Sequence, residues 1–207
     1  MQTKLNTTTY RRADETPDEW FYMHPRFVTH IDDHAIAAVT QLYREYLPTG
    51  GDILDLMSSW ISHLPEEQGY GRVTGLGLNQ RELARNRRLT DYVVHNLNRR
   101  PQLPFADASF DAATCCVSID YLTRPVAVLT DLARVLRPNA PVVITFSNRC
   151  FPTKVISLWL ELTDAQRLDL VRQYLHDTGA FDPIHTLDRS PANGHDPLYA
   201  VIGFRKS

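Results

Sequence analysis

Residues 53–60 read Ile-Leu-Asp-Leu-Met-Ser-Ser-Trp, a short apolar run interrupted by one aspartate and followed by a polar turn. The turn residues Pro48-Thr49-Gly50-Gly51 precede it. An apolar run of this length, bounded by turns, is typical of a strand that is buried on both faces. Such a strand lies inside a parallel sheet with helices on both sides. The stretch therefore predicts an α/β fold with polar residues just beyond a central strand.

The rest of the chain alternates short apolar runs with amphipathic segments. Strands are expected at 52–56, 72–78, 92–94, 110–117, 142–146, 182–187 and 198–204. Helices are expected at 31–46, 58–64, 80–86, 124–136, 153–160 and 164–176, the last opened by a capping box of Thr163 and Gln166. This alternation predicts parallel pairing with right-handed crossovers, hence a three-layer α/β sandwich. Ligands of such sheets bind at the carboxyl ends of the strands, so the residues that follow the first four strands are the main site candidates.

Composition narrows the class of protein. The chain has 207 residues, of which 43% are hydrophobic and 22% charged, as in a globular protein of one domain. Its net charge of −2 gives no global field that attracts nucleic acid or an anionic membrane. No apolar run reaches the roughly 18 residues of a membrane span, and the polar N-terminus lacks the apolar core of a signal peptide. We therefore expect a cytoplasmic protein without a nucleic-acid or membrane partner.

Two segments carry a resemblance to a known family. Residues 103–111 read Leu-Pro-Phe-Ala-Asp-Ala-Ser-Phe-Asp, and residues 132–138 read Leu-Ala-Arg-Val-Leu-Arg-Pro. They resemble the LPF-x-D-x-SFD and R-V-L-K-P-G-G segments of class I S-adenosylmethionine (SAM)-dependent methyltransferases, type 11 branch. The resemblance implies a Rossmann-like fold, with a mainly parallel seven-stranded sheet and an antiparallel C-terminal strand, and it implies SAM as the cofactor.

A narrower resemblance is to a methyltransferase-like subgroup that shares three further segments. These are D-L-x-S-S-W-x-S-H at 55–63, V-x-G-x-G-x-N at 73–79 and F-S-N-R-C-F at 146–151. The subgroup implies the same fold but no particular acceptor.

The loop after the first strand departs from the family pattern. The family has glycines there, whose amides bind the methionine carboxylate of SAM, whereas Met57, Ser59 and Ile61 stand in this chain. Ser58 and Ser59 are expected to compensate in part, with hydroxyls and amides at the start of a short helix.

The second and third strands depart as well. The family ends its second strand with an acid that binds the ribose hydroxyls, but here Gly77 stands at that position and Asn79 is the nearest substitute. The family's adenine-contacting aspartate is replaced by Asn96 or Asn98. The resemblance therefore implies the following cofactor-binding residues: Asp55, Met57, Ser58, Ser59, Gly77, Leu78, Asn79, Asn96, Leu97 and Ser118.

Few side chains are needed for the chemistry, because methyl transfer is an in-line displacement that depends mainly on alignment. His30 is the candidate general base, since similar proteins place the entry of this helix over the cofactor; a capping or packing histidine is the alternative. Tyr22, Tyr121 and Cys150 are expected to contact the substrate, with packing roles as the alternative. His30 and His34 are four residues apart, but no third ligand lies near in sequence, so no metal site is expected.

The sequence thus predicts a SAM-dependent methyltransferase acting on a small-molecule acceptor, because the chain has no long insertion with which to recognise a macromolecule. Residues 1–50 are expected to form an N-terminal arm and lid helix, and residues 51–207 the methyltransferase core. The oligomeric state stays open. The alternative is a non-catalytic binding or scaffolding protein with a remodelled cofactor pocket.

Overall fold

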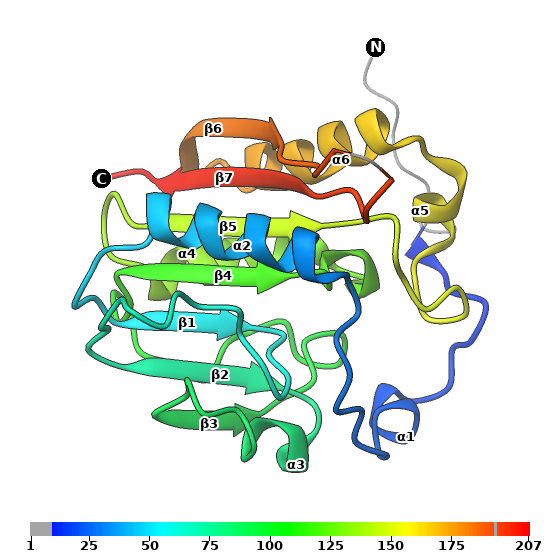
Figure 1. The fold of residues 1–207 in the computed structure, drawn as a ribbon, viewed down its shortest axis with the longest axis horizontal. Coiled ribbons are helices and arrows are strands. Elements are labelled where there is room, and N and C mark those ends of the chain that lie inside the picture. Colours follow the sequence, from blue (N-terminus) through cyan, green and yellow to red (C-terminus); the bar gives the residue numbers. More distant parts are fainter. Residues whose placement is uncertain (1–9, 193) are drawn as a thin grey trace.

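A seven-stranded sheet forms the centre of the computed structural model, which describes residues 10–192 and 194–207. Its strand order is β3-β2-β1-β4-β5-β7-β6 (Figure 1). The strands are β1 (Ile53–Leu56), β2 (Val73–Gly77), β3 (Asp91–Val94), β4 (Ala112–Cys116), β5 (Pro141–Phe146), β6 (Phe181–Asp188) and β7 (Tyr199–Arg205). All pairs from β3 to β5 are parallel, whereas β7 runs antiparallel to both β5 and β6. The predicted sheet with its antiparallel C-terminal strand is confirmed.

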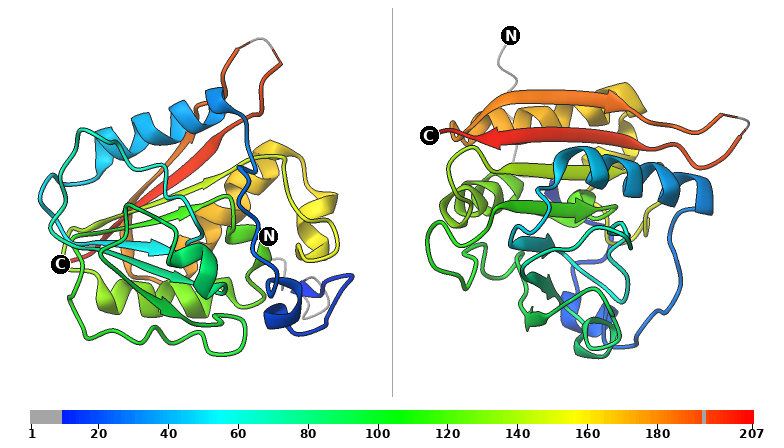
Figure 2. Two further views of the ribbon diagram at one scale, coloured as in Figure 1. Left: turned by 60° about the horizontal axis from the view of Figure 1, so that its bottom comes forward. Right: turned by 60° about the vertical axis from the view of Figure 1, so that its left-hand side comes forward.

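Helices cover both faces of this sheet. α2 (Asp33–Tyr46) lies on one face, and α4 (Pro125–Val135) and α6 (Asp164–Asp177) lie on the other (Figures 1 and 2). The short elements α1 (Asp18–Phe21), α3 (Gln80–Leu83) and α5 (Ser157–Glu161) lie beyond the ends toward which β1, β2, β4 and β5 point (Figure 1). The expected three-layer architecture is confirmed. Among the described residues, no helix has the length and apolar character needed to cross a membrane.

The two long outer helices begin at side-chain caps. The Asp32 carboxylate accepts from the amide of Ala35 at 2.9 Å and starts α2. Thr163 and Gln166 form the predicted capping box at the start of α6, with Thr163 N donating to Gln166 Oε1 at 2.9 Å. These caps satisfy amides that a helix cannot bond internally, so they fix where each helix begins.

The central strand β1 contributes side chains to two hydrophobic clusters. Leu54 and Leu56 belong to the cluster that packs against α4, whereas Ile53 belongs to the cluster under α2. Successive side chains of a strand point to opposite faces, so Asp55 lies on the face of Ile53. A carboxyl group buried there needs polar partners, and the following loop supplies two of them.

The helix predicted at 58–64 does not form, and that prediction was wrong. Residues 57–72 instead make an irregular connection from β1 to β2. The amide of Ser58 donates to the carbonyl of Leu76 at 2.8 Å, which continues the pairing of β1 with β2 past the end of the strand. The chain is thereby held alongside β2 and does not turn into a helix.

Candidate functional site

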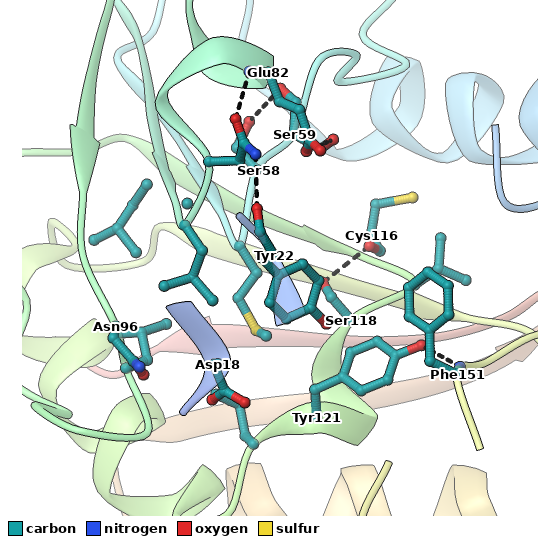
Figure 3. Close-up of a pocket in the computed structure, with 18 of the residues that line it drawn as sticks. Asp18, Tyr22, Ser58, Ser59, Glu82, Asn96, Cys116, Ser118, Tyr121 and Phe151 are labelled. Atoms are coloured by element: carbon teal, nitrogen blue, oxygen red, sulfur yellow. Dashed lines mark hydrogen bonds between the residues drawn. The ribbon is translucent and has the colours of Figure 1, made fainter. Parts of the chain in front are cut away.

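A cavity of about 340 Å³ lies at the carboxyl edge of the sheet (Figure 3), within the range of small-molecule sites. The segments that follow β1, β2 and β5 contribute to its walls, and these are the three segments that carry the narrower resemblance. The N-terminal arm, here residues 10–32, closes another side. Its contribution is Asp18, Tyr22, Arg26 and His30.

The cavity gathers the residues that the sequence singled out, with one exception. From the cofactor set it includes Met57, Ser58, Ser59, Gly77, Leu78, Asn79, Asn96, Leu97 and Ser118, and from the acceptor set His30, Tyr22, Tyr121 and Cys150. Trp60 is not among the lining residues; its indole nitrogen donates to the carbonyl of Val28 at 3.0 Å. Trp60 therefore does not fill the cavity.

Asp55 is the exception, because its carboxylate forms its hydrogen bonds inside the protein. It is 3% exposed and accepts from the hydroxyls of Ser58 and Ser62, each at 2.6 Å, and of Thr114 at 3.0 Å. Burial raises the pKa of this carboxyl above its usual value. Asp55 does not line the cavity; it holds the loop that does.

Gly77 stands where the family has its ribose-binding acid, and the structure shows why no side chain fits. A Cβ atom added at this position would lie 2.2 Å from the backbone carbonyl oxygen of Ser58. The loop after β1 crosses the end of β2 at this point, because Ser58 is paired with Leu76. The absence of an acid at position 77 and the absence of a glycine loop after β1 therefore have one structural cause, the pairing of Ser58 with Leu76.

Asn79 and Glu82 bind the N-terminal arm to α3. The Asn79 side chain caps α3 by accepting from the amide of Arg81 at 2.9 Å, and it donates to the carbonyl of Tyr22 at 2.7 Å. Glu82 accepts from the amide of Arg26 and from the hydroxyl of Ser59, both at 2.7 Å. The amide of Asn79, predicted to reach a ribose, is therefore engaged with the arm.

The two asparagines after β3 hold the arm in a similar way. Asn96 donates to Glu19 at 2.9 Å, and Asn98 donates to Asp18 at 3.0 Å. Asp18 also accepts from Arg12 at 2.6 Å. The arm is thus bonded along the whole side of the cavity that β2 and β3 provide.

Two residues on the cavity wall have strained backbones. Met57 has a φ of 58° and Val117 a φ of 44°, and they follow β1 and β4 directly. The left-handed region is costly for a residue with a side chain, most of all for a β-branched one. Strain of this kind concentrates at functional sites, which supports the assignment of this edge as the site.

Burial shifts the pKa values of three titratable groups on the cavity wall, those of His30, Tyr121 and Cys150. Partial burial lowers the pKa of His30, an effect that the nearby Glu82 charge opposes; the ring lies edge-on to Phe151, with centroids 5.3 Å apart. Burial raises the pKa of Tyr121, whose hydroxyl accepts from the amide of Phe151 at 2.8 Å (Figure 3). Burial also raises the pKa of the Cys150 thiol. A neutral His30 can accept a proton, which Tyr121 and Cys150 in their protonated forms cannot easily do.

Sequence reasoning missed Arg26 and Glu82. Arg26 lies in the aromatic run 20–28, and a single arginine within such a run is a usable signal because guanidinium groups stack on rings. Its Cζ lies 4.5 Å from the ring centre of Phe21 and 5.3 Å from that of Phe151. Glu82 gave no comparable signal, because its neighbours in sequence are those of an ordinary exposed helix.

Comparisons with known proteins agree with the fold. Residues 57–144 match the family model of the methyltransferase domain. An O-methyltransferase of Pyrenophora dematioidea is 36% identical over 84 residues, covering 38% of this chain and 32% of that protein, so the chain matches about a third of that relative's length. Two solved structures share the fold. The [4+2]-cyclase SpnF has a TM-score of 0.64 and 15% identity, with 91% of each chain covered. Phosphoethanolamine N-methyltransferase 2 of Haemonchus contortus in complex with SAM has a TM-score of 0.61 and 16% identity, with 91% of this chain and 56% of that chain covered.

Proposed function

We propose that this chain, whose fold and sequence match are those of class I SAM-dependent methyltransferases, binds SAM in the cavity and transfers its methyl group to a small-molecule acceptor. The observation that carries the proposal is the convergence of the segments after β1, β2 and β5 on one cavity. Three segments that are far apart in the sequence meet there, at the edge where sheets of this kind bind ligands.

The residues present fit a ligand of this kind. The Arg26 Nη1 atom is buried without a hydrogen-bond partner among the described residues, and Arg26 lines the cavity. A buried donor without a partner is costly unless a ligand completes it.

The proposed roles follow from position on the sheet edge. Leu78, Asn96 and Leu97, which follow β2 and β3, would hold the adenosine part of the cofactor. Met57, Ser58, Ser59 and Ser118, which follow β1 and β4, would line its methionine part. When bound, SAM supplies a methyl group activated by the sulfonium sulfur. The arm excludes water from that region.

The acceptor would enter between the arm and the loop after β5. Tyr22, Tyr121 and Cys150 line this part of the cavity and would orient it. His30 is neutral near pH 7 because burial lowers its pKa, so it can take a proton from an acceptor hydroxyl or amine. A cavity of about 340 Å³ closed by the arm favours a small molecule over a polymer.

Calorimetric titration with SAM and its demethylated product S-adenosylhomocysteine (SAH) tests the proposal. Saturable binding of both is expected. Leu78→Trp, which fills the cavity, should abolish binding, whereas Leu160→Trp at an exposed position of α5 should not. Incubation with methyl-labelled SAM and a fractionated extract should then place the label in small molecules.

The absence of binding at millimolar ligand would instead support the non-catalytic alternative. One observation favours that alternative: no acidic side chain stands at the end of β2, and the space for one is filled by the Ser58 carbonyl. Label found in protein or RNA, with SAM binding intact, would overturn only the small-molecule part of the proposal.

A further inference from the structure

Arg26 is held rigidly from several sides. Its backbone amide donates to Glu82 at 2.7 Å, and its Nη2 atom donates to the carbonyl of Phe21 at 3.0 Å. The guanidinium also lies over the rings of Phe21, Tyr22 and Phe151, with its Cζ 4.5 to 5.6 Å from their centres. The group is therefore pre-organised, and little conformational entropy remains to be lost on binding a ligand.

The charge of Arg26 is not compensated. In the described part of the chain no carboxylate forms an ion pair with it, although the other arginine on the cavity wall, Arg149, pairs with Asp196 at 2.6 Å. Its Nη1 atom is buried and makes no hydrogen bond to any described residue. Positive charge with an unused donor on a cavity wall is suited to a carboxylate, which accepts from guanidinium groups.

Glu82 provides the opposite charge on the same wall. It is 7% exposed and lines the cavity. Each of its oxygens accepts one hydrogen bond, from Arg26 N and from Ser59 Oγ, which leaves acceptor capacity on a carboxylate. Both charges act on His30, Glu82 raising its pKa and Arg26 lowering it, and both residues line the same cavity.

We infer that Arg26 and Glu82 form a subsite for the zwitterionic head of an α-amino acid, Arg26 binding its carboxylate and Glu82 its ammonium group. The inference rests on the proposed function where the head is the methionyl end of the cofactor, and it would replace the glycine-loop amides that this chain lacks. The same chemistry is presented by a free amino acid acting as acceptor. Two ligands therefore share one recognition mechanism, and binding measurements separate them.

The first measurement compares SAH with its analogue lacking only the carboxylate and with methylthioadenosine, which lacks the whole amino-acid head. Arg26→Gln should weaken SAH about 10- to 100-fold, the value of a charge-assisted hydrogen bond, and leave the decarboxylated analogue unchanged. Glu82→Gln should weaken SAH and the decarboxylated analogue alike and leave methylthioadenosine unchanged. Arg26→Lys should recover part of the loss.

The matched control is Arg85→Gln. Arg85 also stacks on an aromatic ring, with its Cζ 5.2 Å from the centre of Phe27, but it does not line the cavity. Arg85→Gln should leave unchanged the affinities for SAH, its decarboxylated analogue and methylthioadenosine. Thermal unfolding of each variant checks that the arm remains folded onto the core.

The second measurement tests whether the amino-acid head belongs to the acceptor. The twenty common L-amino acids are added at millimolar concentration to SAH-loaded protein, and the unfolding temperature is followed. If Arg26→Gln leaves SAH binding intact, but an amino acid stabilises the natural protein and not this variant, the head belongs to the acceptor. If neither measurement depends on Arg26, the inference is overturned and the arginine has only a packing role.

Failure of the proposed function gives a different result. If the natural protein binds neither SAM nor SAH, the proposal that SAM is the cofactor is overturned. The amino-acid titration, repeated without SAH, then decides the subsite alone: stabilisation that Arg26→Gln removes supports it, and no stabilisation overturns it.

Discussion

At Gly77 the backbone of one loop passes so close to the neighbouring strand that a side chain would collide with it. A Cβ atom there would lie 2.2 Å from the Ser58 carbonyl oxygen, and a backbone atom cannot move aside cheaply. We expect Gly77→Ala to lower the free energy of unfolding by about 1–3 kcal/mol and to weaken SAH binding, as measured by urea unfolding and calorimetry.

Gly69→Ala is the control for that substitution. A Cβ atom at Gly69 meets nothing within 4 Å, so its stability should remain within about 0.5 kcal/mol of the natural protein. Equal unfolding midpoints for the two variants would contradict the collision at Gly77.

Asp120 gives a second prediction at the scale of a single residue. The side chain is 3% exposed, and burial raises its pKa to about 7, whereas an unfolded aspartate ionises near pH 4. Between these values the folded protein holds one more proton than the unfolded chain, so natural stability falls as pH rises. Asp120→Asn removes this dependence.

The stability of Asp120→Asn relative to the natural protein should therefore increase from pH 4 to about pH 7 and stay level above it. Urea unfolding of both proteins across this range measures the difference. A difference that does not change with pH would mean that Asp120 is already ionised in the fold.

Residue identities located the site better than they assigned its contacts. Met57, Gly77 and Ser118 were predicted from the family resemblance together with their places at or just after the end of a strand, because strand ends meet at one edge. That the side chain of Asn79 is used by the arm could not be foreseen, because Tyr22 lies 57 positions away in sequence. A local pattern contains no information about such a partner.

At the scale of elements, one buried lysine helps to hold the N-terminal arm on the core. Lys154 is 0% exposed, and its Nζ atom donates to the carbonyls of Asp14 at 3.2 Å and Thr16 at 2.7 Å. Lys154→Met keeps the length of the side chain but removes these bonds. Local opening of the arm should become easier by about 1–3 kcal/mol.

Tryptic cleavage after Arg12 or Arg26 should then accelerate roughly 5- to 150-fold, since cleavage follows the population of the open form. Lys206→Met is the control, because Lys206 is exposed and its Nζ atom donates to the carbonyl of Gly179, a residue outside the arm, at 2.8 Å. Unchanged cleavage in Lys154→Met would show that other contacts suffice to hold the arm.

Elements with a strong period were predicted, and those set by long-range contacts were not. The amphipathic stripes of α2 and α4 and the apolar runs of β1 and β5 identify them without tertiary information. The irregular segment after β1 follows β2 because of one bond between Ser58 and Leu76, which competes with local helix formation. The short α1 is likewise held by its docking and not by a sequence pattern.

For the whole molecule, ligand binding should stabilise the fold by mass action. A ligand at 100 times its dissociation constant adds about 2.7 kcal/mol. In a chain of 207 residues this corresponds to a rise of roughly 5–10 °C in the unfolding temperature. SAH should give this shift in a thermal scan, and adenosine, which lacks the amino-acid head, should give a smaller one at equal concentration.

The order of synthesis gives the docked arm a further meaning. Residues 14 and 16 are made before Lys154, which fixes them and follows about 140 residues later. The arm must wait until β1 to β5 have been translated before it can take its final place. The pocket therefore cannot be closed before the segment after β5 has been made, and a chain shortened before residue 154 would have β1 to β5 without the lysine that holds the arm.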